Sequence, residues 1–141
     1  MVHDTNRRPA VATALALSRQ AAVAVAAGRV ALGVAALTRP SVPARPWVGA
    51  SADELGAQVF GRALGARDIA LGLGALLAAR KASQSQTAAW VAAGALSDAL
   101  DTAITASAWS ELPPATRWLI AASAGGAAVA GAAGAVALLL D

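Results

Sequence analysis

The chain has 141 residues, of which 57% are hydrophobic and 13% are charged, and its formal net charge is +3. Soluble domains carry about 25% charged residues, so this chain has too little polar surface to cover a water-soluble fold. The absence of cysteine excludes disulfides, thiolate metal ligands and cysteine nucleophiles, and the single His3 lies too near the N-terminus to hold a haem within a membrane. We expect one integral membrane domain over residues 1–141, with no cofactor, no metal and no nucleic-acid partner.

The first predicted membrane span covers residues 20–38, with an amphipathic extension back to Pro9. It ends before Pro40, because proline disfavours a helical conformation at the residue that precedes it. The segment 40–49 contains three of the six prolines of the chain. We predict that this segment forms an ordered loop at the membrane surface.

The second predicted span covers residues 57–79 and belongs to a helix that begins at a capping box. In this box Ser51 is the N-cap, and Glu54, three residues later, returns a hydrogen bond to the backbone. The following loop, 81–86, is short and polar. We therefore expect the second and third spans to be antiparallel neighbours.

The third predicted span covers residues 87–109, and the fourth covers residues 115–140. Pro113 and Pro114 separate them, and proline is well suited to the first turn of the next helix. Tryptophan is enriched at membrane interfaces. Three tryptophans lie near the ends of these two spans: Trp90, Trp109 and Trp118.

The four spans predict an all-α fold, a four-transmembrane-helix bundle with up-down-up-down connections and both termini on the same side. Loops rich in Lys and Arg stay in the cytoplasm. The N-terminal stretch and the loop between the second and third spans carry five such residues, namely Arg7, Arg8, Arg19, Arg80 and Lys81. The opposite side carries three, namely Arg39, Arg45 and Arg117. This difference favours cytoplasmic N- and C-termini.

Six ionised side chains lie within the predicted spans, three of each sign. They are Arg29, Arg62, Arg67, Asp68, Asp98 and Asp101. A lone charge at the bilayer centre costs roughly 2.5–3.5 kcal/mol, so we expect these side chains to meet one another or water inside the bundle. Arg67 lies about 100° around its helix from Asp68, and two placements stay open for it: contact with Asp98, or approach to the cytoplasmic loop.

The depths of the other five charges predict how they pair. Arg29, Asp68 and Asp98 each fall near the middle of a span, so we expect them to form a central cluster. Arg62 and Asp101 both lie one to two turns nearer the outer face. We therefore predict that these two residues form a second ion pair.

Small residues accompany the charges on one face of each of three spans, at 100° per residue. In the first span this face holds Ser18, Ala22, Arg29, Gly33 and Ala36. In the second it holds Gly61, Gly65, Asp68 and Gly72. In the third it holds Thr87, Gly94, Asp98, Asp101 and Thr105. Small residues at this spacing let membrane helices approach closely, so we predict that the three faces meet along the bundle axis.

Two interpretations of the charges stay open. The ion pairs either fix which helices pair and in which register, or they line a cavity that binds the polar head of a lipophilic molecule or relays protons. Asp98 and Asp101 share a helix face, and paired carboxylates can divide acid and base roles or hold Mg²⁺. Because Arg62 and Arg67 are close in sequence to this layer, we expect salt bridges rather than a metal site.

The string GRALGARDIALGLG over residues 61–74 resembles a signature of small bacterial four-helix membrane proteins near the DoxX-like group. The pieces RVALG at 29–33 and GALSDALD at 94–101 fit the same pattern. The resemblance covers about residues 28–110 and implies a four-helix bundle in a bacterial inner membrane. It implies no catalytic residues, and although DoxX-like proteins are linked to redox complexes, no residue set here is suited to a redox centre.

We predict an integral membrane protein that binds a small amphiphilic or lipid-like molecule at a site formed by Arg29, Arg62, Arg67, Asp68, Asp98 and Asp101. A first alternative is a membrane enzyme of the cyclase, hydrolase or isomerase type, with Asp98 and Asp101 as acid and base. A second is a non-catalytic membrane subunit with structural ion pairs. The expected partners are the lipid bilayer and a lipophilic small molecule. The glycine-rich fourth span either covers the bundle or docks a second copy of the chain.

Overall fold

The structure is a computed structural model that describes residues 7–81 and 83–140, so His3 lies outside it. All regular secondary structure in this part of the chain is helical, which confirms the predicted all-α class. The elements are α1 (Arg7–Thr38), α2 (Ser41–Val48), the 3₁₀ helix η1 (Gly49–Asp53), α3 (Leu55–Arg80), α4 (Gln84–Ser107) and α5 (Pro114–Leu140).

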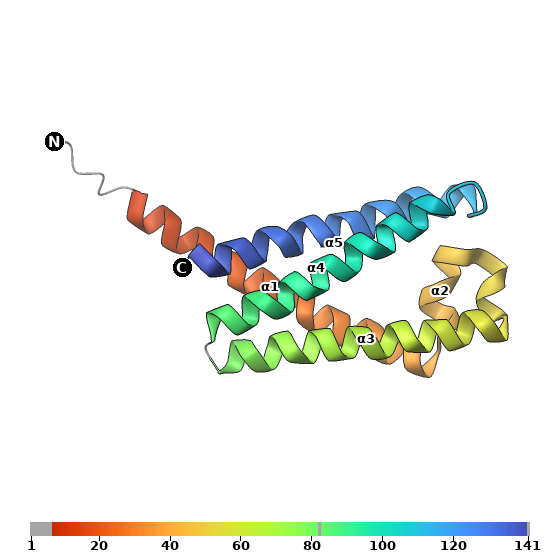
Figure 1. Cartoon of the computed structure of the whole chain (residues 1–141), viewed down its shortest axis with the longest axis horizontal. Helices are drawn as coiled ribbons and strands as arrows, with labels where there is room; N and C mark the ends of the chain where they lie inside the picture. The colour runs from red at the N-terminus through yellow and green to blue at the C-terminus, as the bar shows by residue number, and fades with distance from the viewer. Residues whose placement is uncertain (1–6, 82, 141) are drawn as a thin grey trace.

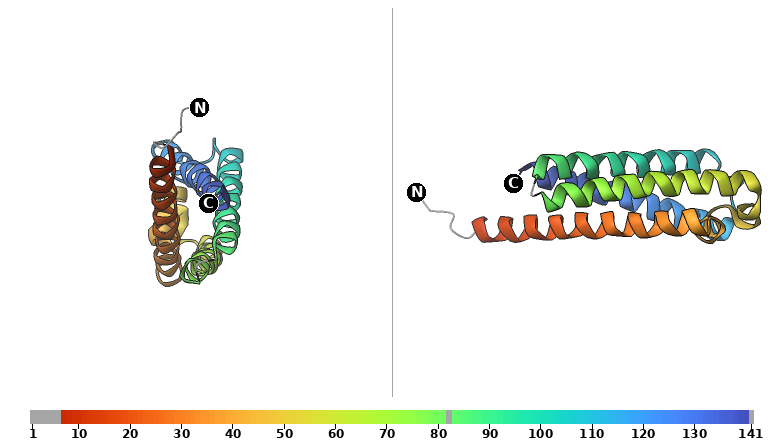
Figure 2. Two further views of the ribbon diagram at one scale, coloured as in Figure 1. Left: turned by 90° about the vertical axis from the view of Figure 1, so that its left-hand side faces the viewer. Right: turned by 90° about the horizontal axis from the view of Figure 1, so that it is seen from below.

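Four long helices, α1, α3, α4 and α5, run side by side and alternate in direction (Figure 1). Helix α1 begins, and α5 ends, at the same end of the bundle, while α2 lies across the opposite end (Figure 1). Figure 2 shows that the first turns of α1 extend beyond the other helices. Helix α1 packs mainly on α3, and α5 packs mainly on α4.

Two segments are long and apolar enough to cross a membrane, Arg19–Thr38 in α1 and Arg117–Leu140 in α5. Helices α3 and α4 have 26 and 24 residues, or about 39 and 36 Å at 1.5 Å per residue, which is also enough to cross ~30 Å of hydrocarbon. Unlike the segments of α1 and α5, however, these two helices contain no stretch that is apolar enough to meet the same criterion. Length and composition alone therefore identify two candidate spans.

The proline-rich segment 40–49 is a helix and not the predicted loop. Helix α2 begins at Ser41, so Pro43 falls in its first turn, where a backbone N–H has no partner within the helix. Pro46 lies inside the helix, which ends two residues later at Val48. Gly49 closes it with a positive φ of 65°, donating its backbone N–H to the carbonyl of Arg45. Proline predicted a break correctly at Pro40, but the same inference was wrong for Pro43.

The predicted capping box of Ser51 and Glu54 is also wrong. Ser51 lies in η1, one turn before the start of α3, and its carbonyl accepts the backbone N–H of Glu54 at 3.1 Å. Glu54 itself is the N-cap of α3, and it makes no side-chain capping bond to the described residues. The start of α3 is held instead by Gln58, whose Nε2 donates to the carbonyl of Asp53 at 3.0 Å.

The turn between α3 and α4 is shorter than the predicted loop, because α4 begins at Gln84. Ser83 is the N-cap, and its carbonyl accepts both the backbone N–H of Thr87, at 2.9 Å, and the Thr87 hydroxyl, at 2.7 Å. Helix α5 begins at Pro114, as the prolines predicted. The helix ends therefore lie within a few residues of the predicted ones.

Small side chains fill the interior and large ones face outward. Among the described residues, the buried hydrophobic side chains are alanines together with Ile120 and Leu138, and none of the large side chains is fully buried. Large apolar side chains lie on the outer surface instead; Phe60, for example, is 73% exposed. The buried polar side chains are Thr87, Asp98 and Thr105. The interior is therefore still mostly apolar, but the many large apolar side chains on the surface and the buried Asp98 are unusual for a water-soluble protein.

Helices α1 and α3 approach to backbone contact along a glycine seam, formed by Gly33, Gly65, Gly72 and Ala26. A Cβ atom added to Gly33 would lie 2.5 Å from the carbonyl oxygen of Gly65. One added to Gly72 would lie 2.5 Å from the carbonyl oxygen of Ala26. The small-residue faces of these helices therefore meet, as predicted, although Gly61 lies against Pro40 rather than against α1.

Candidate functional site

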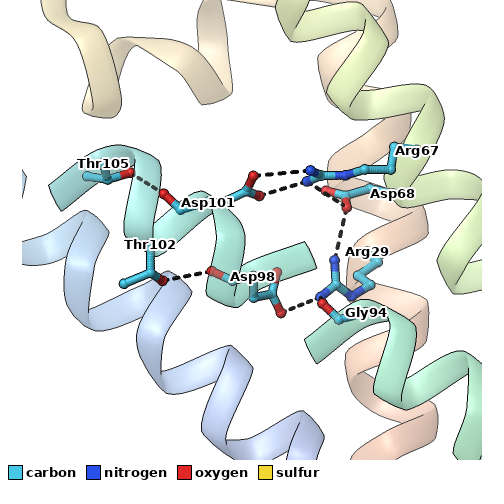
Figure 3. A network of polar contacts seen from close by, with 8 residues as sticks. All are labelled: Arg29, Arg67, Asp68, Gly94, Asp98, Asp101, Thr102 and Thr105. Carbon is cyan, nitrogen blue, oxygen red and sulfur yellow. Dashed lines mark hydrogen bonds and ion pairs between the residues drawn. The ribbon is translucent and has the colours of Figure 1, made fainter. Parts of the chain in front are cut away.

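Five ionised side chains from three helices form a charged cluster in the middle of the bundle (Figure 3). Helix α1 provides Arg29, α3 provides Arg67 and Asp68, and α4 provides Asp98 and Asp101. All five side chains are partly or largely buried, with exposed fractions between 12% and 33%. The cluster therefore joins α1, α3 and α4 through charge.

Arg29 bridges the two other helices. Its Nη1 donates to Asp68 Oδ1 at 2.9 Å, and its Nη2 donates to the carbonyl oxygen of Gly94 at 3.0 Å and to Asp98 Oδ2. A Cβ atom at Gly94 would lie only 3.2 Å from Arg29 Nε, so the glycine makes room for the guanidinium against the α4 backbone. The predicted central ion pairs of Arg29 are confirmed.

Arg67, rather than Arg62, pairs with Asp101. Nη1 and Nη2 of Arg67 donate to the two oxygens of Asp101 at 3.1 and 2.8 Å, which is the strong bidentate arrangement. Nη2 also lies 3.5 Å from Asp68 Oδ1. Both placements left open for Arg67, beside Asp98 or near the cytoplasmic loop, are therefore replaced by the pair with Asp101.

The predicted pair of Arg62 with Asp101 is wrong. Arg62 is exposed, and it forms no ion pair with any residue in the described part of the chain. It lies five residues before Arg67, which is about 140° around the same helix. Arg62 therefore does not reach Asp101 of α4, because it projects from a different side of α3 than Arg67 does.

Two carboxylate oxygens of the charged cluster lack a donor. Asp68 is bound through Oδ1 and Asp98 through Oδ2, and neither Asp68 Oδ2 nor Asp98 Oδ1 accepts a hydrogen bond from the described residues. Arg67 Nε is buried and also lacks a hydrogen-bond partner in this part of the chain. The cluster therefore retains acceptor and donor capacity that its own ion pairs do not use.

The backbone carbonyls of Asp98 and Asp101 each accept a hydrogen bond from a threonine hydroxyl. Thr102 Oγ1 donates to the Asp98 carbonyl at 2.7 Å, and Thr105 Oγ1 donates to the Asp101 carbonyl at 2.7 Å. These hydroxyls bond within their own helix four residues back (Figure 3). Thr105 is thus buried without an unsatisfied polar group, and it makes no direct contact with the charges.

A groove with a volume of about 350 Å³ opens beside the charged cluster. All five charged residues line it, together with apolar residues of α1, α2 and α5, among them Leu32, Trp47, Ile120 and Ala127. The lining therefore combines charged side chains with apolar ones. The contribution of α2 and Trp47 to this site was not predicted from the sequence, because the segment 40–49 was expected to be a surface loop.

A second cavity, of about 170 Å³, lies on the other side of the ion pair between Arg29 and Asp98. Its other lining residues, such as Ala22, Trp90 and Gly134, belong to the half of the bundle that is farther from α2. Arg29 and Asp98 line both cavities. This ion pair is therefore a partition between two spaces along the bundle.

The geometry distinguishes the two carboxylates that were considered as acid and base. Both oxygens of Asp101 are held by Arg67, whereas Asp98 keeps one oxygen without a donor from the described residues. Over residues 7–81 and 83–140, no group of three His, Cys, Asp or Glu side chains is placed to hold a metal ion. The carboxylates of the third predicted span are bound to arginine instead.

The fold and this site together define the class: an all-helical bundle with a charged interior, an apolar surface and a groove that joins the two. Comparisons with protein-family models, with curated proteins and with solved structures give no match to the chain. The resemblance to the DoxX-like group therefore stays a prediction from the sequence.

Proposed function

We propose that the protein spans a membrane four times, through α1, α3, α4 and α5. The lengths of the helices, their large outward-facing apolar side chains and the concentration of charge in the interior support this proposal. In a bilayer, ionised side chains turn toward the bundle interior and pair there. Five of the six do so here, namely Arg29, Arg67, Asp68, Asp98 and Asp101, whereas Arg62 is exposed. The proposed location is a bacterial inner membrane, with both termini in the cytoplasm.

We further propose that the protein binds a small amphiphilic or lipid-like molecule, with its polar head at the charged cluster. The observation that carries this proposal is the groove of about 350 Å³, whose walls combine charged and apolar side chains. Ligand pockets of proteins are about 300–1,000 Å³, mostly apolar, with a few polar groups that orient the ligand. An amphiphile matches both kinds of wall in one molecule.

One alternative has its own support: the ion pairs serve only to hold the helices together. The single guanidinium of Arg29 contacts both α3 and α4, and such a bridge fixes helix register without any ligand. An enzyme that uses Asp101 as acid or base is less well supported, because Arg67 holds both of its oxygens. The two roles can be distinguished by placing a bulky residue in the groove. Such a residue should prevent binding of a ligand if the groove is a binding site, and it should have no such effect if the ion pairs are only structural.

The binding proposal is tested by filling the groove at Gly28, which lines it and where an added Cβ meets no described atom within 4 Å. The matched control is Gly126, where an added Cβ also meets no such atom but which lines neither cavity. Native mass spectrometry of the protein in a neutral saccharide detergent would follow twelve-carbon probes with amine, alcohol and sulfate heads.

The wild type and Gly126→Leu should retain at least one of these probes, and Gly28→Leu should retain none. Both variants should keep the wild-type helix content, because neither site is packed against a neighbour. Equal retention by the two variants would show that the groove is not the binding site. A wild type that retains no probe would favour the purely structural role.

The proposed orientation has a direct test, because the chain has no cysteine of its own. Ser51 and Ser85 are exposed at opposite ends of the bundle, in η1 and in the first turn of α4. In intact spheroplasts, a membrane-impermeant maleimide should label Ser51→Cys, and it should label Ser85→Cys only after lysis. The reverse pattern would invert the orientation, and labelling of both before lysis would contradict a membrane between the two ends.

A further inference from the structure

We propose that the polar head bound at the charged cluster is a protonated amine. This inference rests on the proposed function, because it names the class of amphiphile that the groove takes. It follows from two features of the cluster that its ion pairs do not satisfy. One is its balance of charge, and the other is the set of oxygens without a donor.

The charged residues that line the groove carry one more negative than positive charge. Two are cationic, Arg29 and Arg67, and three are anionic, Asp68, Asp98 and Asp101. Arg62, which would have balanced them, is exposed and forms no ion pair with the described residues. In an environment of low polarity, a surplus charge is unfavourable unless a bound partner compensates it. The groove therefore complements a guest with one positive charge.

The carboxylate oxygens without a donor indicate which kind of cation fits. Asp68 Oδ2 and Asp98 Oδ1 accept no hydrogen bond from the described residues, although their partner oxygens are bound to one guanidinium, that of Arg29. Because that guanidinium holds both carboxylates, the two free oxygens belong to neighbouring side chains. A protonated primary amine has three N–H donors and no acceptor, so it supplies both charge and donors.

The rest of the groove suits the chain of such a molecule. Leu32 of α1, Trp47 of α2 and Ile120 of α5 also line it. No further cation reaches it among the described residues: Arg45, the basic residue of α2, is exposed and pairs with Asp53 at 2.7 Å. An alkylammonium ion thus has an apolar path for its chain and an anionic site for its head.

The experiment compares four twelve-carbon probes of similar length: dodecylamine, dodecyltrimethylammonium, 1-dodecanol and dodecyl sulfate. Each is added separately to the wild type in a neutral saccharide detergent, and retention is measured by native mass spectrometry and by the shift in melting temperature. We expect the amine to bind about tenfold or more tightly than the alcohol, because its hydrogen bonds are charge-assisted. The sulfate should bind least, and the trimethylammonium ion, which lacks N–H donors, should bind less tightly than the amine.

Two substitutions test the source of this preference. Asp98→Asn removes the surplus charge and should bring retention of the amine down to that of the alcohol. Asp53→Asn is the matched control, because it makes the same chemical change in an exposed ion pair outside the groove; it should leave the order of the probes unchanged. If Asp98→Asn does not fold, Asp68→Asn can be used instead, because it removes the same charge from the other carboxylate that has a free oxygen.

The outcomes separate this inference from the proposed function. Retention of amine and alcohol to the same extent, as expected if a proton on a carboxylate already neutralises the surplus, would overturn the amine assignment and leave the binding groove in place. Equal retention of the trimethylammonium probe would overturn the role of the N–H donors. Retention of no probe by the wild type would overturn both proposals.

Discussion

Toward α3, helix α1 makes backbone contact, whereas toward α5 it borders the groove. On the first side, a Cβ atom at Gly33 would meet the Gly65 carbonyl oxygen at 2.5 Å. On the second, a Cβ atom at Gly28 would meet no described atom within 4 Å. The same residue type, five positions apart on one helix, serves a close contact in one case and leaves an open space in the other.

The difference shows how the bundle keeps a space beside its charges. Close packing joins α1 to α3 and α4 to α5, and the two helix pairs meet less extensively across the groove. The ion pairs of Arg29 and Arg67 cross from one helix pair to the other. Packing therefore holds each pair together, and the pairs are joined both by these charges and by the close contact of Gly74 in α3 with the Trp90 ring in α4.

The largest effect is expected from Arg29→Gln, which removes the bridge between the two helix pairs. Asp98 would be left without its ion-pair partner, and breaking a buried pair in this way costs ~3–5 kcal/mol. Thermal unfolding followed by circular dichroism in detergent would measure the loss. Arg45→Gln is the control, since its ion pair with Asp53 is exposed and worth at most about 1 kcal/mol. Equal losses in the two variants would contradict the bridging role of Arg29.

A smaller effect is expected from Gly33→Leu, which tests the closed side of α1. The new side chain would force α1 and α3 apart, and overpacking of this kind costs about 1–3 kcal/mol. Gly28→Leu, the same exchange on the open side, should leave the melting temperature within a few degrees of the wild type. If both variants lost the same stability, the contrast between the two sides of α1 would not hold.

The helix boundaries were largely predictable, and the rotational placement of the charges was only partly so. Prolines and a short polar loop predicted the end of α3 and the starts of α4 and α5 to within a few residues, whereas the start of α3 was predicted from a capping box that does not form. The ion pairs of Arg29 followed from depth and from one stripe per helix. Arg62 and Arg67 lie on opposite sides of Asp68 around α3, so choosing between them requires knowing on which side α4 packs. The handedness of the bundle determines on which side of α3 helix α4 packs. This handedness cannot be read from the hydrophobic periodicity of the sequence.

The contribution of α2 to the groove was not predictable for a different reason. Prolines usually mark breaks, and the segment 40–49 has three of them within seven positions. Pro43 is compatible with a helix here because Ser41 begins it, so proline occupies a first turn. Folding this segment into a helix across the end of the bundle brings Trp47 to the groove. Local sequence does not show that distant contact.

The partition formed by Arg29 and Asp98 also bears on leakage of ions. A membrane protein with a cavity toward each end would dissipate ion gradients if the two cavities joined into a water-filled channel. Here Arg29 and Asp98 line both cavities, and their ion pair is reinforced by the contact of Arg29 with the Gly94 carbonyl. The residues proposed to receive the head of a guest would therefore also separate the two cavities.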